Sequence, residues 1–450
     1  MDRGGKPGAL RSRRTATDKG GEQMGEQYSG IGATYDSMTG LMDRMTFFGD
    51  VNEYRKRRVQ CHIVLVQLSR LMQVNRKYGI TVGDQLIRDI SMWLAELDEA
   101  YKVYRIANSR LMLLGPACSR QQAEACVNRI HSRFGENWQV ACEGQEHTVL
   151  AKTYLIHLFL DPEDTENDLL DKMNFGITVL EKKGRDGMVF FDEEIKRDME
   201  HQKYVLEEVR YAIDHKTFRM YYQPIYDCKE ERFVSAESLI RLWDRQGTFI
   251  SPGEFIPMAE EHGLIDQISW IVLEKVCRFL GAHPELELQT VSVNLTGQQV
   301  SDVTLIDRIE TLLADCQLSG SRLRIEITER TVADDFEEVK KTMMRLQEKG
   351  IRFYLDDFGT GYSNLSSMFS LPFEVIKFDQ SLVRMIDVSR NGRRTISLLA
   401  QLMHENDYRI VAEGIETAQQ AQTVRETGVD RIQGFYYAKP LPEEELLQLL

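Results

Sequence analysis

Eight short apolar runs recur between residues 218 and 437, and this rhythm restricts the fold of the chain more than any other feature of its sequence. Each run is rich in strand-forming residues and ends at a turn or at the start of a helical pattern. The runs are 218–226, 234–242, 290–295, 323–328, 351–356, 374–378, 409–412 and 431–437. Eight strands with intervening helices over about 250 residues predict a (β/α)8 barrel of the TIM type.

Helical patterns occupy most of the intervals between these runs. Ser251, Pro252 and Glu254 have the spacing of a capping box, with proline at the first helical position. Another pattern, 336–348, stops just before Gly350, a residue suited to a helix C-cap. Strands and covering helices are therefore expected to alternate along this half of the chain.

The first half of the chain has a less regular pattern. Residues 1–29 are rich in Gly, Arg, Lys and Ser and nearly free of large apolar side chains, so we expect a disordered tail. In residues 30–195, helical patterns such as 82–97 alternate with strand-like apolar runs. These runs are 62–68, 111–114, 149–158 and 188–191. The alternation predicts an α/β domain with a mixed sheet.

A charged segment, 196–215, separates the two halves and carries apolar residues near helical spacing. Such a pattern is typical of a linking helix with a solvated face. The domain boundary is expected inside it, which leaves residues 216–450 for the barrel. A chain of 450 residues is long enough for these two domains, because single cores usually stop growing near about 250 residues.

Composition excludes several classes of function. The net charge of -14 argues against a general nucleic-acid or membrane-surface binder, because such proteins need a basic face. The 7 cysteines are scattered without a CxxC pair, which fits a reducing compartment. No apolar run approaches the roughly 20 residues that span a bilayer. We therefore expect a cytoplasmic protein that binds neither DNA nor a membrane.

Polar residues that can ligate a metal, or act beside one, end most of the predicted strands. They are Glu237, Asn294, Glu326, Asp356, Asp357, Lys377, Glu413 and Gln433. Active sites of such barrels lie at the carboxyl ends of the strands, where these residues fall. Taken singly, a strand-end Glu is more often a solvated end, and Lys377 by default is a surface lysine. The convergence of several such ends is what favours a site.

Alternation along the second run gives its side chains a direction. Glu237, Leu239 and Arg241 share one parity, so a carboxylate and a guanidinium are expected to face the same pocket. Ser238 has the opposite parity and should lie outside it. The structural alternative is that Arg241 pairs with a neighbouring acid.

The adjacent acids Asp356 and Asp357 cannot both point inward from a regular strand. We expect the strand to end there, with Phe358-Gly359 supplying the turn. Carboxylates crowded near 4 Å repel by roughly 4 kcal/mol at an effective dielectric constant of 20, so the site predicts bound cations. Oxygen ligands without His or Cys favour Mg²⁺ or Mn²⁺ over zinc. Two such ions can activate water for displacement at phosphorus.

Motifs in the second half also match a known family. The matching segments are Gln223-Pro224-Ile225, Glu237-Ser238-Leu239 with Arg241, Asn294, Glu326-Ile327-Thr328-Glu329, Asp356-Asp357-Phe358-Gly359-Thr360-Gly361-Tyr362-Ser363, Lys377 with Asp379, Ala412-Glu413-Gly414-Ile415-Glu416-Thr417 and Gln433-Gly434-Phe435. Over residues 201–450 the chain resembles the EAL domain of cyclic di-GMP phosphodiesterases. The one departure in the signature is Ser238, where the family has Ala.

The resemblance implies a role for each matched residue. The implied ligands of two ions, Mg²⁺ or Mn²⁺, are Glu237, Asn294, Glu326, Asp356, Asp357 and Glu413. Lys377 and Gln433 would hold the attacking water, completing a catalytic set with Glu237 and Glu413. Glu329 would brace the loop after Asp357, which helps to form a homodimer in relatives. Arg241 would contact a substrate phosphate, and the other implied substrate-binding residues are Gln223, Leu239 and Asp379.

The first half resembles a GGDEF domain, the diguanylate cyclase fold of nucleotidyl-cyclase type. The matches are Asp36, Thr39-Gly40-Leu41, Arg44, Asn75, Tyr78-Gly79 and Gly83-Asp84. The signature loop is replaced by Arg105-Ile106-Ala107-Asn108-Ser109-Arg110-Leu111, and Gln67 stands at a metal-binding Asp position. Without the acids nothing holds Mg²⁺, so we expect no cyclase activity. Asn75 and Asp84 alone would more simply cap helices.

Three hypotheses of function follow from the sequence. The favoured one is metal-dependent hydrolysis of cyclic di-GMP to linear pGpG, with the degenerate GGDEF domain regulating the enzyme through GTP or a protein partner. The second is a catalytically silent cyclic di-GMP receptor. The third is a protein-interaction scaffold. Retention of Glu237, Asp357, Lys377 and Glu413 favours the first.

Overall fold

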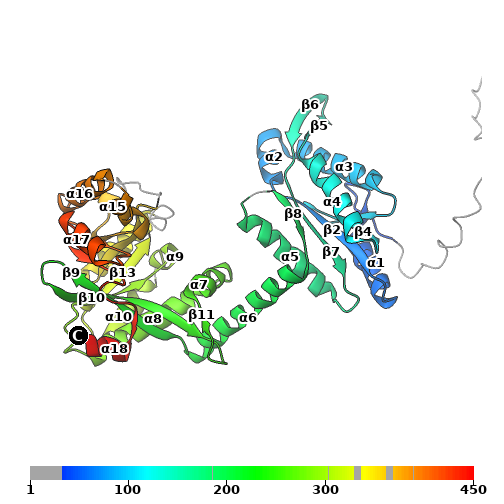
Figure 1. Cartoon of the computed structure of the whole chain (residues 1–450). Coiled ribbons are helices and arrows are strands. Elements are labelled where there is room, and N and C mark those ends of the chain that lie inside the picture. The colour runs from blue at the N-terminus through cyan, green and yellow to red at the C-terminus, as the bar shows by residue number, and fades with distance from the viewer. Residues whose placement is uncertain (1–32, 185, 303, 329–335, 361–367, 389) are drawn as a thin grey trace, which may run out of the picture. The chain divides into compact units, whose positions relative to one another are not determined.

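The computed structural model describes residues 33–450, apart from 185, 303, 329–335, 361–367 and 389 (Figure 1). It divides the chain into two compact units, Met1–Glu200 and His201–Leu450. The division falls within the long helix α6 (Glu193–His215). Met199 of α6 packs in a core of the first unit, and Val205 and Val209 pack in that of the second. The tail expected at 1–29 lies outside the described residues.

The first unit is built on a six-stranded sheet in the order β1-β3-β4-β2-β7-β8. β1 is parallel to β3 and β8 to β7, while the other neighbours are antiparallel, so the predicted mixed sheet is confirmed. The strands are β1 Met42–Asp43, β2 Cys61–Leu68, β3 Lys102–Ala107, β4 Arg110–Pro116, β7 Thr153–Leu160 and β8 Gly187–Phe190.

Helices cover both faces of this sheet. They are α1 (Arg44–Lys56), α2 (Leu71–Tyr78), α3 (Ile80–Leu97), α4 (Arg120–Phe134) and α5 (Glu166–Lys182). Successive side chains of β2 point to opposite faces. Val64 and Val66 accordingly pack in the core with α3 and α4, whereas Ile63 and Leu65 pack in the core with α1 and α5.

The prediction of a single strand at 149–158 is wrong. The run contains the end of β6 (Gln145–Leu150) and most of β7, separated by Ala151 and Lys152. β6 forms a hairpin with β5 (Asn137–Cys142), whereas β7 pairs with β2 in the main sheet. A continuous apolar run does not reveal this change of sheet, because both strands contribute apolar residues to it.

The second unit is a closed barrel of eight strands, which confirms the predicted TIM-like fold. The strands are β9 Arg219–Asp227, β10 Arg232–Trp243, β12 Thr290–Asn294, β13 Leu323–Thr328, β14 Arg352–Phe358, β15 Phe373–Phe378, β16 Arg409–Ala412 and β17 Arg431–Ile432. Two short strands, β11 (Phe249–Ile250) and β18 (Leu441–Pro442), pair with β10 and β9 at the rim.

One barrel strand departs from the regular all-parallel arrangement. β9 is antiparallel to both its neighbours, β10 and β17, whereas β10 and β12 to β17 are parallel. A turn of residues 228–231 joins β9 to β10, in place of a helix. Antiparallel neighbours can be joined by such a short turn, whereas parallel ones need a longer crossover.

Helices follow most of the parallel strands and cover the barrel (Figure 1). They are α7 Pro252–Glu261, α8 Ile265–Ala282, α9 Gly297–Val300, α10 Leu305–Asp315, the 3₁₀ helix η1 Gly320–Arg322, α12 Phe336–Glu348, α14 Gln380–Val383, α15 Met385–Val388, α16 Arg390–His404, α17 Ala418–Glu426 and α18 Glu443–Leu449. None of the described helices is both long enough and apolar enough to cross a bilayer.

The predicted helix 336–348 is confirmed at both ends, and Gly350 has a φ of +87°. Ser251 is the N-cap of α7 with Pro252 in the first turn, as expected. Its side chain forms no capping hydrogen bond in the described structure, so the predicted capping box is not formed. The spacing located the start of the helix without fixing the contacts.

The last barrel strand is shorter than the run 431–437 that predicted it. β17 ends at Ile432, and the chain then passes close to the backbone of residue 415. A Cβ at Gly434 would lie 2.1 Å from the carbonyl oxygen of Ile415. Gly434 therefore permits a close approach of two loops, which ends the strand just where Gln433 enters the barrel mouth.

Candidate active site at the barrel mouth

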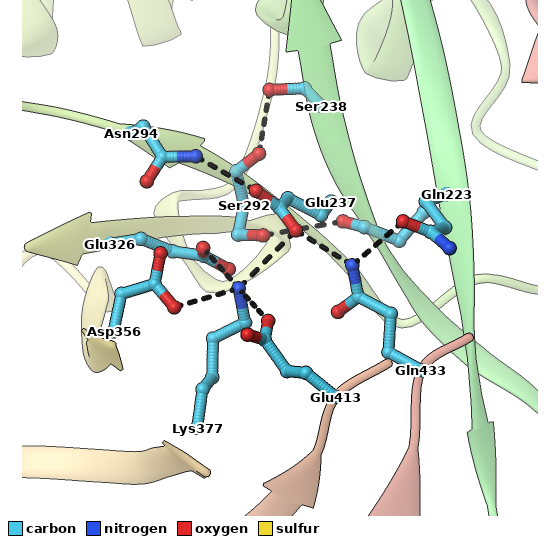
Figure 2. Close-up of polar contacts among 11 residues, drawn as sticks. Gln223, Glu237, Ser238, Ser292, Asn294, Glu326, Asp356, Lys377, Glu413 and Gln433 are labelled. Carbon is cyan, nitrogen blue, oxygen red and sulfur yellow. Dashed lines mark hydrogen bonds and ion pairs between the residues drawn. The ribbon is translucent and has the colours of Figure 1, made fainter. Parts of the chain in front are cut away.

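The barrel interior places the predicted polar residues in one layer. Four apolar side chains pack together inside the barrel: Ile225, Tyr354, Val375 and Val411. Each is two residues from a polar side chain of the same parity, and these are Gln223, Asp356, Lys377 and Glu413. Figure 2 shows the polar layer, with side chains from different strands converging on Lys377.

Lys377 lies at the centre of four carboxylates. Its Nζ is 2.7 Å from Glu413, 2.8 Å from Glu326, 3.1 Å from Asp356 and 3.2 Å from Glu237. The lysine side chain is 1% exposed and that of Glu326 is fully buried. An ammonium in this position offsets the repulsion of acids that the strand ends bring together.

Side-chain amides complete the site around Glu237. Asn294 Nδ2 donates to Glu237 Oε1 at 2.9 Å, and Gln433 Nε2 donates to Glu237 Oε2 at 2.7 Å (Figure 2). Gln433 Nε2 is also 3.1 Å from Oε1 of Gln223, whose own amide donates to the carbonyl oxygen of Ala438. Glu237 is therefore held by partners from three other strands.

Burial and charge together set the ionisation of this group. Burial alone would lower the pKa of Lys377, but the surrounding acids hold it well above its usual range. Burial raises the pKa of Glu413 to about 8 and that of Glu326 well above its usual range, against the attraction of Lys377. For Glu237, the lysine and the two amides outweigh burial and lower the pKa. One ammonium does not satisfy four carboxylates.

Asp357 reaches the mouth through an unusual backbone. Its φ is +57°, and the pairing of β14 with β15 shifts register between Leu355 and Phe358. The irregularity lets adjacent acids leave the strand in different directions, as expected, although the strand continues to Phe358. Burial and the neighbouring Asp356 raise the pKa of Asp357.

The residues present fit a divalent cation. Oxygens of Glu237, Glu326 and Asp356 all lie within 4.8 Å of one another. Glu326 Oε1 is buried and has no hydrogen-bond partner among the described residues. A buried carboxylate oxygen without a donor is costly, and a hard cation would satisfy it. Asn294 donates to Glu237, and Glu413 pairs with Lys377, so both lie beside these acids. Asp357 does not belong to the group of three oxygens.

Two cavities adjoin the site. One of about 370 Å³ contains Glu237, Asp356, Lys377, Glu413 and Gln433 in its lining. A larger one of about 1430 Å³ is lined by Leu239, Arg241 and Asn294, among others. Ser238 and Ile240, of the opposite parity, line this larger cavity as well, and Glu237 does not. The pocket that alternation predicts Glu237 and Arg241 to share therefore stays a prediction. Ser238 lines only the larger cavity and donates to the carbonyl oxygen of Ser292 at 2.7 Å.

Two further predicted residues lie apart from the cluster around Lys377. Asp379 is the N-cap of α14, where its side chain accepts from the backbone N–H of Ser381 at 2.8 Å. After burial and Asp356, its charge contributes to the raised pKa of Asp357. Glu329 lies outside the described residues.

Sequence reasoning assigned no role to three residues that line the smaller cavity, Gln380, Glu416 and Phe435. Gln380 Nε2 is 3.3 Å from Glu416 Oε1, and a Cβ at Gly414 would collide with the Gln380 side chain. Phe435 is 55% exposed. Their positions next to Asp379, Glu413 and Gln433 in sequence were the available signal.

In the first unit, residues of the segment 105–111 contact Gln67 and Asp36. Gln67 Nε2 donates to Ser109 Oγ at 2.9 Å, and Arg110 Nε donates to Gln67 Oε1 at 2.6 Å. Arg105 pairs with Asp36 at 2.8 Å. Hydrogen bonds thus join Gln67 to both Ser109 and Arg110.

Comparison with protein families matches both units. A family model described as EAL domain matches residues 206–440. One described as diguanylate cyclase, GGDEF domain, matches residues 33–187.

Curated relatives extend over both regions. The signaling protein YkoW of Bacillus subtilis is 28% identical over 432 residues, covering 93% of this chain and 53% of YkoW. The cyclic di-GMP phosphodiesterase NbdA of Pseudomonas aeruginosa is 28% identical over 431 residues, covering 93% of this chain and 54% of NbdA. The chain thus spans about half the length of these relatives.

Among solved structures, the PaMucR phosphodiesterase in complex with c-di-GMP matches with a TM-score of 0.51 and 30% identity. The match covers 54% of this chain and 99% of that one. An EAL domain protein from Listeria monocytogenes matches with a TM-score of 0.50 and 27% identity, covering 54% and 96%.

Proposed function

The chain belongs to the EAL domain family and carries a GGDEF domain ahead of the EAL domain, and from this premise we propose that it hydrolyses cyclic di-GMP to linear pGpG. Relatives named as cyclic di-GMP phosphodiesterases and the match to PaMucR with c-di-GMP support the substrate. The proposal concerns this chain alone, since the relatives are longer.

The observation that carries the proposal is the buried acidic cluster around Lys377. Burying four carboxylates with one ammonium costs folding free energy, and Glu326 Oε1 has no donor in the described structure. A scaffold or a simple receptor gains nothing from such an arrangement. A hydrolase would use these acids to hold divalent cations, which when bound would polarise the phosphate and lower the pKa of a bound water.

The ligand set we propose for two Mg²⁺ or Mn²⁺ ions consists of Glu237, Asn294, Glu326, Asp356, Asp357 and Glu413. Oxygen-only ligands and the absence of His or Cys from this set favour these metals. Lys377, whose pKa is raised, keeps its proton at neutral pH and stabilises negative charge developing on the reacting oxygen. Gln433, fixed by Glu237 and Gln223, orients the attacking water through its buried Oε1.

Substrate binding is assigned to residues outside the acidic cluster. Arg241 and Leu239 line the larger cavity beside Asn294, where the guanidinium would contact a phosphate. Gln223 lines the smaller cavity, whereas Asp379 is assigned to substrate binding on the family motif alone. Glu329 would brace the loop that follows Asp357, on the strength of the family motif alone.

The remaining assignments rest on the family and the composition. We propose a cytoplasmic protein that forms a homodimer through the EAL domain. Free cysteines at all 7 positions support a reducing compartment. We further propose that the GGDEF domain is regulatory, through GTP or a protein partner, and makes no cyclic di-GMP. Gln67, Ser109 and Arg110 support this, since none of them can ligate Mg²⁺ as a carboxylate does.

One assay tests the function. The chain is incubated with cyclic di-GMP and Mg²⁺ or Mn²⁺, and the formation of pGpG is followed with and without EDTA. The Glu237→Ala variant should form no product, while Glu310→Gln, at an exposed pair with Lys349, should match the unaltered chain. Binding of cyclic di-GMP without formation of pGpG would favour the receptor hypothesis. The absence of both binding and product would favour the scaffold hypothesis.

A further inference from the structure

A row of polar contacts fastens helix α6 to the loop that follows strand β10. The side chains of His201, Tyr204, Glu208 and Tyr211 are spaced so that they share one face of the helix. His201 pairs with Glu254, at the start of α7. The other three contact the loop 244–248, which joins β10 to β11.

Glu208 makes the strongest of these contacts. Its side chain is 1% exposed and accepts from Arg245 Nε at 2.8 Å, from a second guanidinium nitrogen at 2.6 Å and from the Arg245 backbone N–H at 3.1 Å. A buried carboxylate with three charge-assisted bonds fixes both the side chain and the backbone of its partner. The guanidinium also lies 5.3 Å from the ring of Tyr211.

The loop that Glu208 holds is itself tightly bonded. Asp244 accepts from the backbone N–H groups of Gln246 at 2.9 Å and Thr248 at 2.7 Å. Tyr204 Oη lies 2.6 Å from Asp244 Oδ2 and 2.9 Å from Gln246 Oε1. A displacement of the helix would therefore move the loop as a unit.

Aromatic contacts connect the end of β10, where the loop 244–248 begins, to Arg241. Trp243, the last residue of β10, packs against Phe249 of β11 at 5.3 Å and stacks on Tyr221 of β9 at 5.9 Å. The Arg241 guanidinium lies 5.5 Å from the Tyr221 ring, and its Nη1 donates to the carbonyl oxygen of Ile240 at 2.9 Å. Aromatic and backbone groups thus place Arg241, and no carboxylate of the described residues forms an ion pair with it.

We propose that Glu208 and Tyr204 are positioning residues for Arg241, and that α6 thereby sets how this guanidinium meets the substrate phosphate. The contact with the substrate phosphate rests on the proposed function, whereas the positioning of Arg241 by α6 does not. Loosening the loop 244–248 leaves the acidic cluster intact, since Lys377 and its four partners make no contact with it among the hydrogen bonds and ion pairs described. Binding should therefore suffer more than the chemical step.

Kinetics of two variants test the proposal. Glu208→Gln removes the charge from the buried pair, and Tyr204→Phe removes only the hydroxyl, so that folding is preserved in at least the second. Each should raise KM for cyclic di-GMP about three- to tenfold and change kcat less than twofold. The reason is that losing a contact made equally to the substrate and to the transition state raises KM and leaves kcat unchanged. Glu310→Gln, which breaks an exposed pair elsewhere on the barrel, should change neither. Equal falls in kcat with KM unchanged would overturn the proposal.

A double-mutant cycle asks whether the effect passes through Arg241. In the Arg241→Ala background, Tyr204→Phe should raise KM no further, because the group it positions is gone. A purely structural contribution of Tyr204 would instead give the same fold-change in both backgrounds. Additive effects would therefore overturn the assignment even if the single variants behave as expected.

Hydrogen exchange separates this proposal from the proposed function. In Glu208→Gln, the backbone amides of residues 241–248 should exchange faster than in the unaltered chain, while those of β13 and β15 should not change. If the unaltered chain forms no pGpG but exchange accelerates as described, the proposed function fails and the positioning of β10 by α6 stands. Unchanged exchange at 241–248 would overturn the positioning itself.

Discussion

Nζ of Lys377 lies 2.8 Å from Oε2 of Glu326, and the two side chains are 1% and 0% exposed. This pair is the centre of the barrel mouth, because the other three acids reach the same ammonium. A lysine so placed holds the acids together in the metal-free protein. Its removal is therefore a test of stability as well as of catalysis.

Replacing Lys377 by Met should abolish turnover and destabilise the barrel. The substitution leaves buried carboxylates without a cation, which costs roughly 3–5 kcal/mol of the free energy of unfolding. Urea denaturation at pH 8 in EDTA measures the loss, and the two units allow two transitions. Lys349→Met, at an exposed pair with Glu310, should cost less than about 1 kcal/mol. A Lys377→Met barrel as stable as the unaltered one would contradict this account of the cluster.

The metal-free barrel should lose stability as pH rises through the range in which Glu413 ionises. Burial raises the pKa of Glu413 to about 8, above its unfolded value. The native state then binds the proton that the unfolded state has released, so stability is present below the unfolded pKa and is lost toward pH 8. Between pH 6.5 and 8 we expect a loss of about 2 kcal/mol in urea denaturation with EDTA.

Glu413→Gln is the matched control for this pH dependence, because it keeps the shape of the side chain without the titration. The slope should flatten in the variant, and the transition that responds is that of the barrel. Adding Mg²⁺ to the unaltered chain should reverse the slope, since carboxylates must be deprotonated to bind a metal. A free energy of unfolding that does not vary across this range in EDTA would argue against the raised pKa.

The strand ends of the barrel could be predicted because each ends an apolar run that leads into a turn or a helical pattern. Alternation alone predicted one pocket for Glu237 and Arg241, but the two residues line different cavities, so the shared pocket stays a prediction. The central place of Lys377 could not be predicted from periodicity, since it depends on which strands are neighbours across the barrel. The strand-end pattern placed Lys377 at the barrel mouth, and the family motif gave it a role.

The differences between sequence and structure have local causes. Alternation gives no strand direction, so the antiparallel β9 was not foreseen. Strand β17 ends early because of the loop contact at Gly434, a tertiary effect. The segment that contains Glu208 was assigned to a helix with a solvated face. Nothing in a charge pattern shows that this carboxylate becomes buried against Arg245, 37 positions away in sequence.

Ser238→Ala tests whether this departure from the family signature matters. The hydroxyl donates to the carbonyl oxygen of Ser292 at 2.7 Å and does not line the cavity that contains Glu237. Loss of one buried hydrogen bond should cost about 1 kcal/mol of the free energy of unfolding. Rates of pGpG formation should stay within twofold of the unaltered chain. A tenfold change in kcat would place Ser238 in the catalytic machinery.

The first unit should be sensitive to acid through a buried histidine pair. His62 Nε2 and His157 Nδ1 are 3.3 Å apart, and His62 Nδ1 is 2.6 Å from the hydroxyl of Tyr101. Burial lowers the pKa of His62 to about 3 and that of His157 to about 4. The unfolded state therefore binds protons that the native state does not, and stability is lost as pH falls below about 6.5.

Denaturation at pH 7 and pH 5 measures this effect, with an expected loss of roughly 2 kcal/mol for each histidine. His157→Gln keeps a hydrogen-bonding side chain that does not titrate, so the loss between these pH values should be about half as large. Equal losses in the variant and the unaltered chain would assign the acid sensitivity to other groups.

Asp357→Asn should separate stability from activity at the barrel mouth. Asn tolerates the positive φ of +57° at this position, so the backbone is retained. Burial and Asp356 raise the pKa of Asp357, which means that its charge destabilises the metal-free protein. The neutral amide should therefore leave the free energy of unfolding unchanged or raise it slightly in EDTA, since solvent screens this partly exposed charge. Turnover should fall at least about 100-fold, because an amide is a weaker ligand than a carboxylate for Mg²⁺. Calorimetric titration with Mn²⁺ should show weaker binding in the same variant, and full activity in Asp357→Asn would remove this residue from the proposed ligand set.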